Sequence, residues 1–293
     1  MGWARLMAAA RPIVLAAVAA VWFAGGCTQQ RPCAGESALQ IVAHADDDLV
    51  LLSPDLWRDV TSGRCVRTVY LTGGDAGGPL QASTSREAGI QAAYATMAGG
   101  ANTWTTSDAG LQGRSIRMVT LTAAPQVSLV FLRLPDGGAD GGGFPRYRSQ
   151  SLPKLWSGSI EHIRAIDGSE TYTRATLISA LTELISDFAP SVVRTLDPDV
   201  ANWDHPDHHS VGSFAMAAHA AVPQPTALTT YRGYSMVDYP PNVSGAELAG
   251  KREAIRTYAT YDPVIWQFEF AVDRQYVITT IPGPAGAATA GGG

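Results

Sequence analysis

Short runs of apolar residues alternate along this chain with longer segments whose apolar residues recur at helical spacing. The short runs are rich in branched side chains, which is typical of buried strands. The predicted strands are residues 39–43, 66–72, 127–134, 192–195 and 276–281. The predicted helices are residues 84–97, 177–188, 208–221 and 247–258. Strands and helices therefore alternate through most of the chain.

Two of the predicted helices carry local signals for their ends. Thr84 and Glu87 have the spacing of a capping box, which predicts that a helix begins at Thr84. Apolar residues from Leu177 to Phe188 form one helical stripe, and Pro190 ends that helix. We expect this stripe to belong to the core.

The alternation predicts an α/β fold of three layers, in which a mostly parallel, Rossmann-like sheet has helices on both faces. The chain has 293 residues, 46% of them hydrophobic, which is enough for one large domain, placed here at residues 39–281. Ligands in such folds bind beyond the carboxyl ends of the strands. The residues that follow the predicted strands are therefore the first candidates for a site.

The first 26 residues have the pattern of an export signal. Arg5 and Arg11 are followed by an uncharged apolar run over residues 13–24, shorter than the roughly 20 residues of a membrane-spanning helix. Cleavage after residue 26 would leave Cys27 first, and the Ala-Gly-Gly-Cys sequence there resembles the lipobox of bacterial lipoproteins, with Ala24 in place of the usual Leu. We expect a lipid on Cys27 that holds the domain at the membrane surface, facing outward, with plain secretion as the alternative.

The two other cysteines, Cys33 and Cys65, form an even pair if Cys27 is acylated. Disulfides persist outside the cytoplasm, so a bridge between them is plausible. Such a bridge would stabilise the fold by about 3–4 kcal/mol in the chain-entropy model. Two buried free thiols are the alternative.

Three segments have the composition of linkers or loops. Residues 27–38 are predicted to connect the lipidated cysteine to the domain. Gly dominates residues 135–143 and, with Ala and Pro, residues 282–293. These patterns predict a mobile loop and a disordered tail.

The charge of the chain does not favour nucleic acid as a partner. Its formal net charge is -5, and loss of the leader with its two arginines would leave -7. There is also no long run of Lys and Arg in the sequence. Binding to an anionic polymer is therefore not expected.

One imidazole and three carboxylates follow the first predicted strand, at His44 and at Asp46, Asp47 and Asp48. Carboxylates packed at the end of a buried segment repel one another and lose hydration, unless a cation, hydrogen-bond donors or open solvent compensate. A metal site would supply that compensation. The alternative is an acidic N-cap for a helix that starts here.

A second polar cluster, Asp-His-Pro-Asp-His-His over residues 204–209, follows the strand at 192–195. His205 and His208 are three residues apart at a helix entry, so they could face the same way. Such a pair suits metal binding or acid-base chemistry, whereas the alternative is a polar turn with solvated imidazoles. Two such clusters after strands of one domain favour a shared site.

The two clusters together resemble the two motifs of the PIG-L/LmbE family of zinc deacetylases. The first is the strand followed by His-x-Asp-Asp, and the second is His-Pro-Asp-His. Weaker matches are the Thr-Gly-Gly-Asp-Ala-Gly turn at 72–77, Arg86, the helix at 251–258, and Tyr261 with Asp262. The resemblance spans about residues 39–262.

The resemblance implies a catalytic zinc ion, with His44, Asp47 and His208 as ligands and a fourth position left for water. It implies that Asp46 is the general base that takes a proton from the attacking water. His205 would stabilise the oxyanion or protonate the leaving amine. Hydrolysis of an amide needs all three of these functions.

For other residues around the motifs, more than one role is open. Asp207 is expected to orient a histidine or cap the helix, and His209 is interpreted as solvated rather than as a ligand. Arg86 matches a substrate-binding position, with a surface ion pair as the alternative. Ala45 replaces the family's usual Pro and Asp48 its frequent Glu, which leaves the efficiency of the site open.

The resemblance also implies the substrate, which is an N-acetylglucosamine-type amino sugar within a glycoconjugate. Export would place that glycan or glycolipid outside the cytoplasm. Trp203 could stack on a sugar ring or serve as a core anchor. The alternatives for the whole protein are a zinc amidohydrolase for a non-sugar amide and a non-catalytic lipoprotein that binds glycan.

Overall fold

The computed structural model describes Met1, residues 36–224 and residues 226–283. The predicted signal peptide, the lipid on Cys27, most of the linker, Cys33 and the tail from residue 284 fall outside these residues. Cys65 takes part in a disulfide. That its partner is Cys33 stays a prediction, because Cys33 is not among the described residues.

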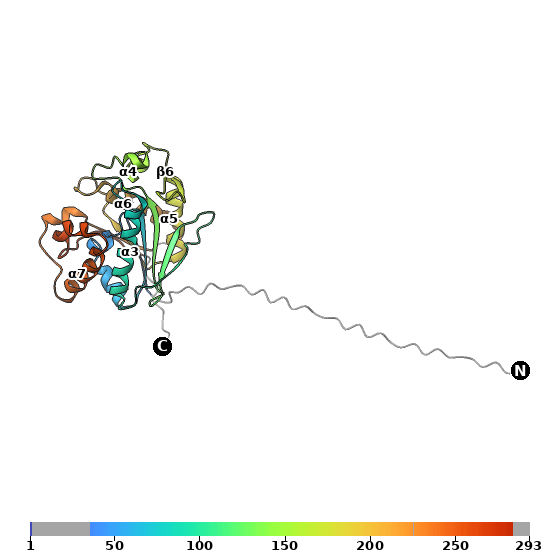
Figure 1. The fold of residues 1–293 in the computed structure, drawn as a ribbon, viewed down its shortest axis with the longest axis horizontal. Coiled ribbons are helices and arrows are strands. Elements are labelled where there is room, and N and C mark those ends of the chain that lie inside the picture. The colour runs from blue at the N-terminus through green and yellow to red at the C-terminus, as the bar shows by residue number, and fades with distance from the viewer. Residues whose placement is uncertain (2–35, 225, 284–293) are drawn as a thin grey trace, which may run out of the picture. The chain divides into compact units, whose positions relative to one another are not determined.

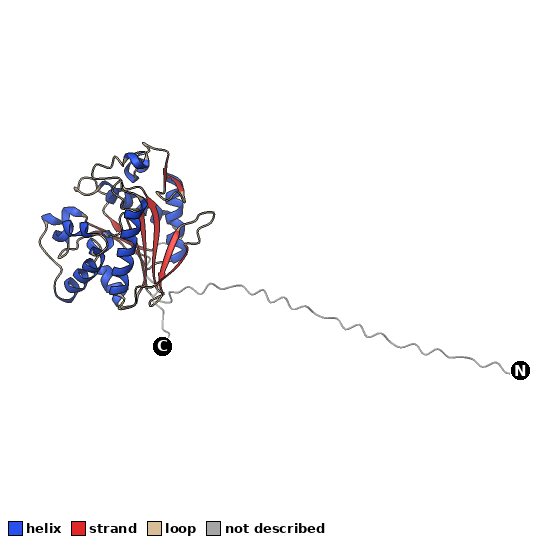
Figure 2. Cartoon of the chain, in the orientation of Figure 1, coloured by secondary structure: helices blue, strands red, loops and turns tan. Residues whose placement is uncertain are grey.

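An eight-stranded sheet forms the centre of the fold (Figures 1 and 2). Its order is β10-β9-β8-β1-β2-β5-β4-β3. The strands are β1 (Ser37–Val42), β2 (Cys65–Thr72), β3 (Trp104–Asp108), β4 (Arg117–Leu121), β5 (Val127–Leu134), β8 (Val192–Leu196), β9 (Ala227–Tyr231) and β10 (Val277–Ile281). The five strands from β9 to β5 are parallel, whereas β10, β4 and β3 add antiparallel edges. The mostly parallel sheet predicted from the sequence is thus confirmed.

Helices pack in two groups. The first group is α1 (Asp47–Val50), α2 (Asp55–Thr61), α3 (Leu80–Met97) and α7 (Gly245–Ala259), and the second is α4 (Leu152–Ser157), α5 (Arg174–Phe188) and α6 (Pro206–Ala221). Helix α3 packs on α7, and α5 packs on α6, with α3 and α5 on either side of the strands in Figure 1. A hairpin of β6 (His162–Arg164) and β7 (Thr171–Thr173) and the short helices η1 (Pro145–Tyr147), η2 (Tyr234–Asp238) and η3 (Pro263–Ala271) complete the described domain.

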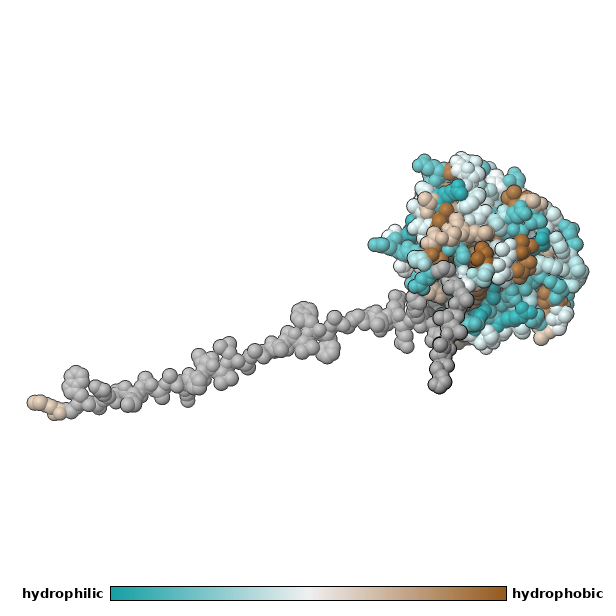
Figure 3. Space-filling view, turned by 180° about the vertical axis from the view of Figure 1, so that it is seen from behind, coloured by the Kyte–Doolittle hydropathy of each residue, from teal (hydrophilic) through white to brown (hydrophobic). Residues whose placement is uncertain are grey.

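Burial follows from this layering. Every residue of β1 and β2 is buried, because helices cover both faces of the parallel strands. Leu177, Leu181 and Leu184 of the predicted stripe on α5 are fully buried, as expected for a core face. From behind, hydrophobic and hydrophilic residues are interspersed on the surface (Figure 3). No helix in the described ranges is both long and apolar enough to cross a membrane.

The predicted start of α3 was wrong. The helix begins at Leu80, so Thr84 lies within it and donates a hydrogen bond to the carbonyl of Gln81. Glu87 does not close a capping box, because both of its carboxylate oxygens bind the guanidinium of Arg133 on β5. Glu87 therefore forms a tertiary ion pair, whereas its spacing from Thr84 had predicted a role in a helix cap.

The order of the sheet determines where a site can form. Strand β1 lies between β2 and β8, and the chain leaves β1 and β8 towards helices of the two different groups. The loops after two such strands diverge, and they open a crevice at the carboxyl edge of the sheet. The first polar cluster follows β1, and the second follows β8.

Candidate active site

Asp47 is the point at which the two clusters meet. Its Oδ2 accepts hydrogen bonds from the backbone N–H groups of Ala43 at 3.1 Å and His44 at 2.7 Å, which fixes the carboxylate at the start of α1. Its Oδ1 then faces His208 Nε2 at 3.0 Å and His44 Nδ1 at 3.4 Å. Asp46 does occupy the N-cap position of α1, and Asp47 and Asp48 lie in its first turn, but the Asp46 side chain makes no capping bond.

His208 is held between two carboxylates in the first turn of α6. Its Nε2 faces Asp47, and its Nδ1 lies 2.8 Å from Asp204 Oδ1. The same Asp204 oxygen accepts the backbone N–H groups of His205 at 2.8 Å and Tyr234 at 3.0 Å. Burial opposes a positive charge on His208, but Asp204 and Asp47 outweigh it and raise its pKa to about 10.

Within the predicted donor set, Asp47 lies at ligand spacing from both His44 and His208. The groups of described residues whose ligand atoms all lie within 4.8 Å of one another include His44 with Asp46 and Asp47, and His44 with His205 and His208. Zinc ligand atoms at about 2.0–2.2 Å in a tetrahedral site lie roughly 3.3 Å from one another, close to the separations measured from Asp47 Oδ1. The pKa of His44 is also raised, because Asp47 and then Asp207 and Asp136 outweigh its burial. Each imidazole thus lies among carboxylates. Without a metal, protons on the imidazoles balance this negative charge, and a bound divalent cation would balance it instead.

Asp46 lies beside this group in the wall of a cavity of about 450 Å³. Burial raises the pKa of Asp46 to about 6, although the nearby Arg86 opposes that shift. A buried carboxylate with a pKa close to the working pH is suited to accept and return a proton. The structure therefore brings the predicted base and the predicted ligands together.

His205 is the N-cap of α6, and its Nδ1 accepts the backbone N–H of Asp207 at 3.2 Å. Burial, and then positive charge on His44 and His208, lower its pKa to about 4. A neutral ring whose Nδ1 accepts a bond carries its proton on Nε2. His205 can therefore donate one hydrogen bond into the cavity that it lines.

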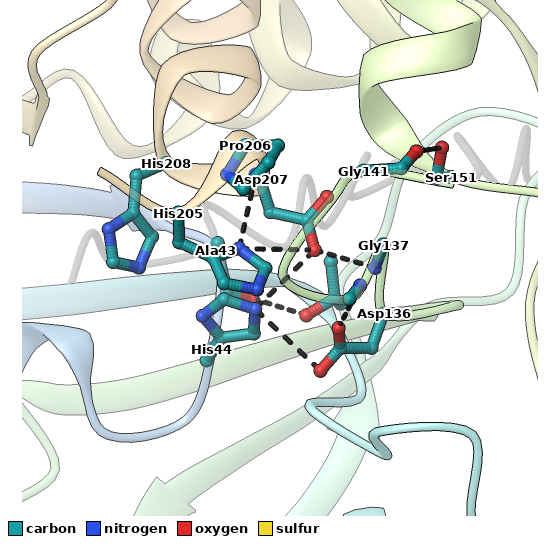
Figure 4. A network of polar contacts seen from close by, with 12 residues as sticks. Ala43, His44, Asp136, Gly137, Gly141, Ser151, His205, Pro206, Asp207 and His208 are labelled. Carbon is teal, nitrogen blue, oxygen red and sulfur yellow. Dashed lines mark hydrogen bonds and ion pairs between the residues drawn. The ribbon is translucent and has the colours of Figure 1, made fainter. Parts of the chain in front are cut away.

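Asp207 and Asp136 complete the carboxylate side of the site (Figure 4). Asp207 Oδ2 lies 3.4 Å from His44 Nε2 and accepts the N–H of Gly137 at 2.8 Å. Asp136 Oδ2 lies 3.8 Å from the same nitrogen. Asp207 thus contacts a histidine, which agrees with one of the two roles expected for it. It does not cap the helix, because His205 does.

Sequence reasoning missed Asp136 and Asp204. Asp136 falls in the Gly-rich segment at 135–143. The glycine content of this segment predicted a mobile loop, and its aspartate was given no role. It nevertheless follows β5 at the same edge of the sheet, and this signal could have identified it. Asp204 lies four residues before His208 and was left without a role.

Arg86 reaches the site from α3. Its Nε lies 3.0 Å from Asp262 Oδ2, with side chains 17% and 10% exposed, and Tyr258 donates to the same oxygen at 3.2 Å. The pair lies largely within the protein rather than on its surface, and Arg86 lines the cavity. Contact with substrate stays a prediction.

The expectation for His209 was wrong, and one of the two alternatives for Trp203 is excluded. His209 is buried, and its Nδ1 lies 3.1 Å from the backbone oxygen of Asp197, so it is not solvated. Trp203 is 54% exposed and donates to Asp238, so it is not a core anchor. Its stacking on a sugar stays a prediction, since Trp203 is absent from the described residues that line the cavity.

Asp48 lies under the site rather than in it. Its Oδ2 accepts hydrogen bonds from the hydroxyls of Tyr70 at 2.7 Å and Tyr94 at 2.5 Å. Burial raises the pKa of Asp48 to about 7, and the two hydroxyls oppose that shift. One oxygen of this aspartate is therefore bonded from the core, whereas its buried Oδ1 has no hydrogen-bond partner among the described residues.

Solved structures with similar folds include enzymes of more than one kind. N,N'-diacetylchitobiose deacetylase from Pyrococcus horikoshii is 16% identical, with a TM-score of 0.49 over 81% of this chain and 75% of that chain. The 4-carboxy-2-hydroxymuconate hydratase GalB from Pseudomonas putida is 13% identical, with a TM-score of 0.48 over 80% and 82%. A conserved protein from Thermus thermophilus is 18% identical, with a TM-score of 0.44 over 85% and 94%.

No curated protein matches this chain. A family model does match, over residues 39–219, which is more than half of the sequence. That model describes PIG-L, GlcNAc-PI de-N-acetylase. The matched span contains both polar clusters and the strands that place them. The chain therefore belongs to the PIG-L family of N-deacetylases, which are hydrolases of carbon–nitrogen bonds other than peptide bonds.

Proposed function

We propose that this protein removes the acetyl group from an N-acetylglucosamine-type amino sugar of a glycoconjugate, with zinc held by His44, Asp47 and His208. The observation that carries the proposal is the convergence of the two imidazoles, His44 and His208, on Asp47 Oδ1, with Asp46 in the wall of the adjoining cavity. Zinc, when bound, would polarise the acetyl carbonyl and make water more acidic.

The side chains around the proposed zinc site carry out the proton transfer and the stabilisation of the transition state. Asp46 takes a proton from the attacking water and passes it to the departing amine, for which a pKa of about 6 is suitable. His205 in its neutral form donates a hydrogen bond from Nε2 to the oxygen that becomes negative in the transition state. This assignment favours oxyanion stabilisation for His205 over protonation of the amine, because its low pKa leaves the ring without a spare proton.

The amino sugar would occupy the cavity of about 450 Å³, in which Arg86 binds its hydroxyl groups. Phe144, Tyr234, Phe268 and Phe270 add aromatic surface to the same walls, and apolar sugar faces pack well on aromatic rings. The family description supports an N-acetylglucosamine conjugate as the substrate class.

The proposed place of action is outside the cytoplasm. The export pattern of the first 26 residues supports it, and so does the disulfide at Cys65. A lipid on Cys27 would hold the enzyme at the membrane surface. Intact-mass analysis of the protein from membranes tests this, since a mature chain without lipid mass on Cys27 contradicts anchoring and leaves secretion.

The function is tested by metal content and acetate release. The mature protein is compared with Asp46→Asn and His208→Ala on N-acetylglucosamine oligomers, glycolipids and amides without sugar. We expect about one zinc per chain in wild type and in Asp46→Asn, with activity lowered roughly 10²–10⁴-fold by loss of the base. His208→Ala should lose both zinc and activity, whereas His219→Ala, at the far end of the same helix, should keep both.

Other outcomes discriminate among the alternatives. Acetate release from sugar-free amides alone would replace the amino-sugar proposal with a different amidohydrolase. Glycan binding that survives Asp46→Asn, with no amine released by wild type from any substrate, would contradict catalysis and favour a binding protein. A metal-free wild type that is active would remove zinc from the mechanism.

A further inference from the structure

A second cavity, of about 500 Å³, lies next to the proposed active site and has the opposite charge. Its walls are η1, the residues that follow η1, and the β6-β7 hairpin with its turn. Three guanidinium groups line it, from Arg146, Arg148 and Arg164, and Asp167 is the only carboxylate among its described lining residues. We name it the arginine cavity.

Among the described residues, the arginines of this cavity have no acidic partners. Asp167 pairs with Arg133 instead, at 2.9 Å, and Arg146, Arg148 and Arg164 form no ion pair within the part of the chain that the structure describes. Clustered positive charge is notable in a chain whose net charge is -5. Like charges around one cavity repel, and an anion bound between them would remove that repulsion.

Most of the hydrogen-bonding capacity of these side chains is unused. Arg146 gives one hydrogen bond, from Nε to the Gly77 oxygen at 3.1 Å, and Arg164 gives one, from Nη2 to the Gly168 oxygen at 3.3 Å. A guanidinium has five N–H donors in a planar fork that matches the oxygens of a carboxylate or a phosphate. The remaining donors are therefore available to an oxyanion.

The backbone that carries the arginines is held in place. Arg148 and Ser149 both adopt left-handed conformations, with φ of 56° and 52°, which residues other than glycine rarely take. Gln150 fixes this turn to β6, because its Oε1 accepts the N–H of Arg164 at 3.1 Å and its Nε2 donates to the oxygen of His162 at 3.3 Å. A left-handed backbone conformation costs energy in residues other than glycine, and that energy cost is expected where a loop must present particular side chains.

The two cavities share a wall. Ala76 lines the active-site cavity, and the carbonyls of the next two residues, Gly77 and Gly78, accept bonds from Arg146 and from the Tyr147 hydroxyl at 2.7 Å. Phe144 also lines the active-site cavity, two residues before Arg146. Two residues of chain span at most about 7 Å, so the two cavities lie close enough for an extended ligand that passes over their shared wall.

We propose that the arginine cavity binds an oxyanion group, a phosphate or a carboxylate, carried by the same glycoconjugate whose amino sugar is deacetylated. The inference rests on the proposed function for the identity of that glycoconjugate. The cavity itself, with its unpaired guanidiniums, points to the anion. The preferred substrate class is thus an acidic glycan or glycolipid rather than a neutral one.

The first test measures anion binding and does not depend on catalysis. Titration calorimetry with inorganic phosphate is performed on the zinc-loaded protein, on Arg148→Gln/Arg164→Gln, and on Arg256→Gln as an exposed arginine of α7. We expect the double variant to bind phosphate roughly tenfold more weakly, given the strength of charge-assisted hydrogen bonds, and Arg256→Gln to match wild type. Phosphate binding that is unchanged in the double variant places the anion elsewhere, such as at the metal, and overturns the proposal.

The second test compares matched substrates. N-acetylglucosamine oligosaccharides are used neutral, with one phosphate, or with one carboxylate, and kcat/KM for acetate release is measured. Wild type should prefer at least one acidic form, and the double variant should lose roughly tenfold on that form while the neutral rate changes less than about twofold. Whichever acidic form loses its advantage identifies the anion.

Failure of the two proposals can be distinguished. If no acetate is released from any substrate, the proposed function fails, and the phosphate titration still decides whether the arginine cavity binds an anion. If neutral and acidic substrates react equally in wild type, or if the double variant slows both equally, the acidic-substrate inference is overturned while deacetylation stands. Near- and far-ultraviolet circular dichroism confirms that the double variant is folded.

Discussion

The active-site cavity and the arginine cavity share a wall, yet they hold charge in opposite ways. In the first, carboxylates and imidazoles are buried and bonded to one another, as Asp47 and Asp204 are to His208. In the second, guanidiniums such as Arg148 are exposed and lack acidic partners among the described residues. Buried charges have strongly shifted pKa values and depend on their partners, whereas exposed charges act weakly and through water.

This difference predicts how each region responds to change. A single substitution in the buried network should leave other groups without a partner, so its effect should be large. A substitution in the exposed cavity should change binding by modest and graded amounts. Four measurements test this difference between buried and exposed charge.

Asp204→Asn should give the largest effect, although Asp204 is not itself a proposed ligand and only contacts one, His208. Asp204 orients His208 through Nδ1, and loss of such a carboxylate partner typically weakens metal binding about 10–100-fold. Zinc affinity measured by competition with a chelator checks this, with Asp199→Asn as an exposed control. Unchanged zinc affinity would show that Asp204 only positions the backbone of His205 and Tyr234.

Tyr94→Phe should destabilise the support beneath the site. It removes one of the two hydroxyls that donate to buried Asp48 Oδ2, the one at 2.5 Å, and the loss of such a buried hydrogen bond costs about 1–3 kcal/mol. The loss should be greater at pH 8 than at pH 5, because the hydroxyl favours the ionised form of Asp48, whose pKa is raised to about 7. Urea unfolding measures it, with half-exposed Tyr261→Phe as the control. An equal loss at both pH values would contradict the hydrogen-bond explanation.

Lys251 extends the comparison to a buried cation outside both cavities. Its ammonium donates to the carbonyls of Ala271 and Arg274, and burial lowers its pKa to about 7. Between that value and about 10.4 in the unfolded chain, the unfolded state binds more protons, so stability rises with pH by about 1 kcal/mol per unit.

The substitution Lys251→Met isolates this contribution. The free energy of unfolding of wild type relative to the variant should rise from pH 7 to pH 9, as measured by urea unfolding at each pH. Arg252→Met, at the exposed neighbouring position, should leave the pH dependence unchanged. Parallel pH profiles for wild type and Lys251→Met would mean that Lys251 stays protonated in the fold.

Salt should produce the smallest effect and should separate the two cavities. Raising NaCl from about 0.05 to about 0.5 M shortens the screening length to a few ångströms, so the preference for acidic over neutral substrates should fall several-fold. The rate on the neutral substrate should change little, because the charges of the active site are buried. An equal loss of rate on both substrates would place the salt effect in the active site and not in the arginine cavity.

Much of the fold could be predicted because it depends on local pattern. Strand β5 was predicted with its observed bounds, and β1, β2 and β8 to within two residues, since branched apolar runs are typical of strands that helices cover on both faces. The antiparallel strands β3 and β4 were missed, and so was the parallel strand β9. Most of β3 is exposed, so it lacks that apolar signal. The start of α3 was wrong because Glu87 pairs across the sheet and not within its own helix.

The candidate site was predicted to a similar extent. Spacing and residue type identified the two clusters, and the rule that ligands bind beyond the carboxyl ends of the strands predicted that the clusters lie together. His209 was misassigned because its neighbours in sequence are polar, while the carbonyl that it contacts belongs to Asp197, twelve residues away. Asp136 was missed because the glycine content of its loop predicted mobility and not a functional site.

By itself, the sequence determined which chemical groups are present, which strands precede them, and the family to which the chain belongs, because these are properties of local order and residue type. Only the tertiary structure decided that Asp204 and Asp47 hold His208, that Asp136 reaches His44, and that three arginines surround one cavity. These contacts join residues from different loops, and their pKa values and free donors depend on burial and partners that the folded chain alone provides.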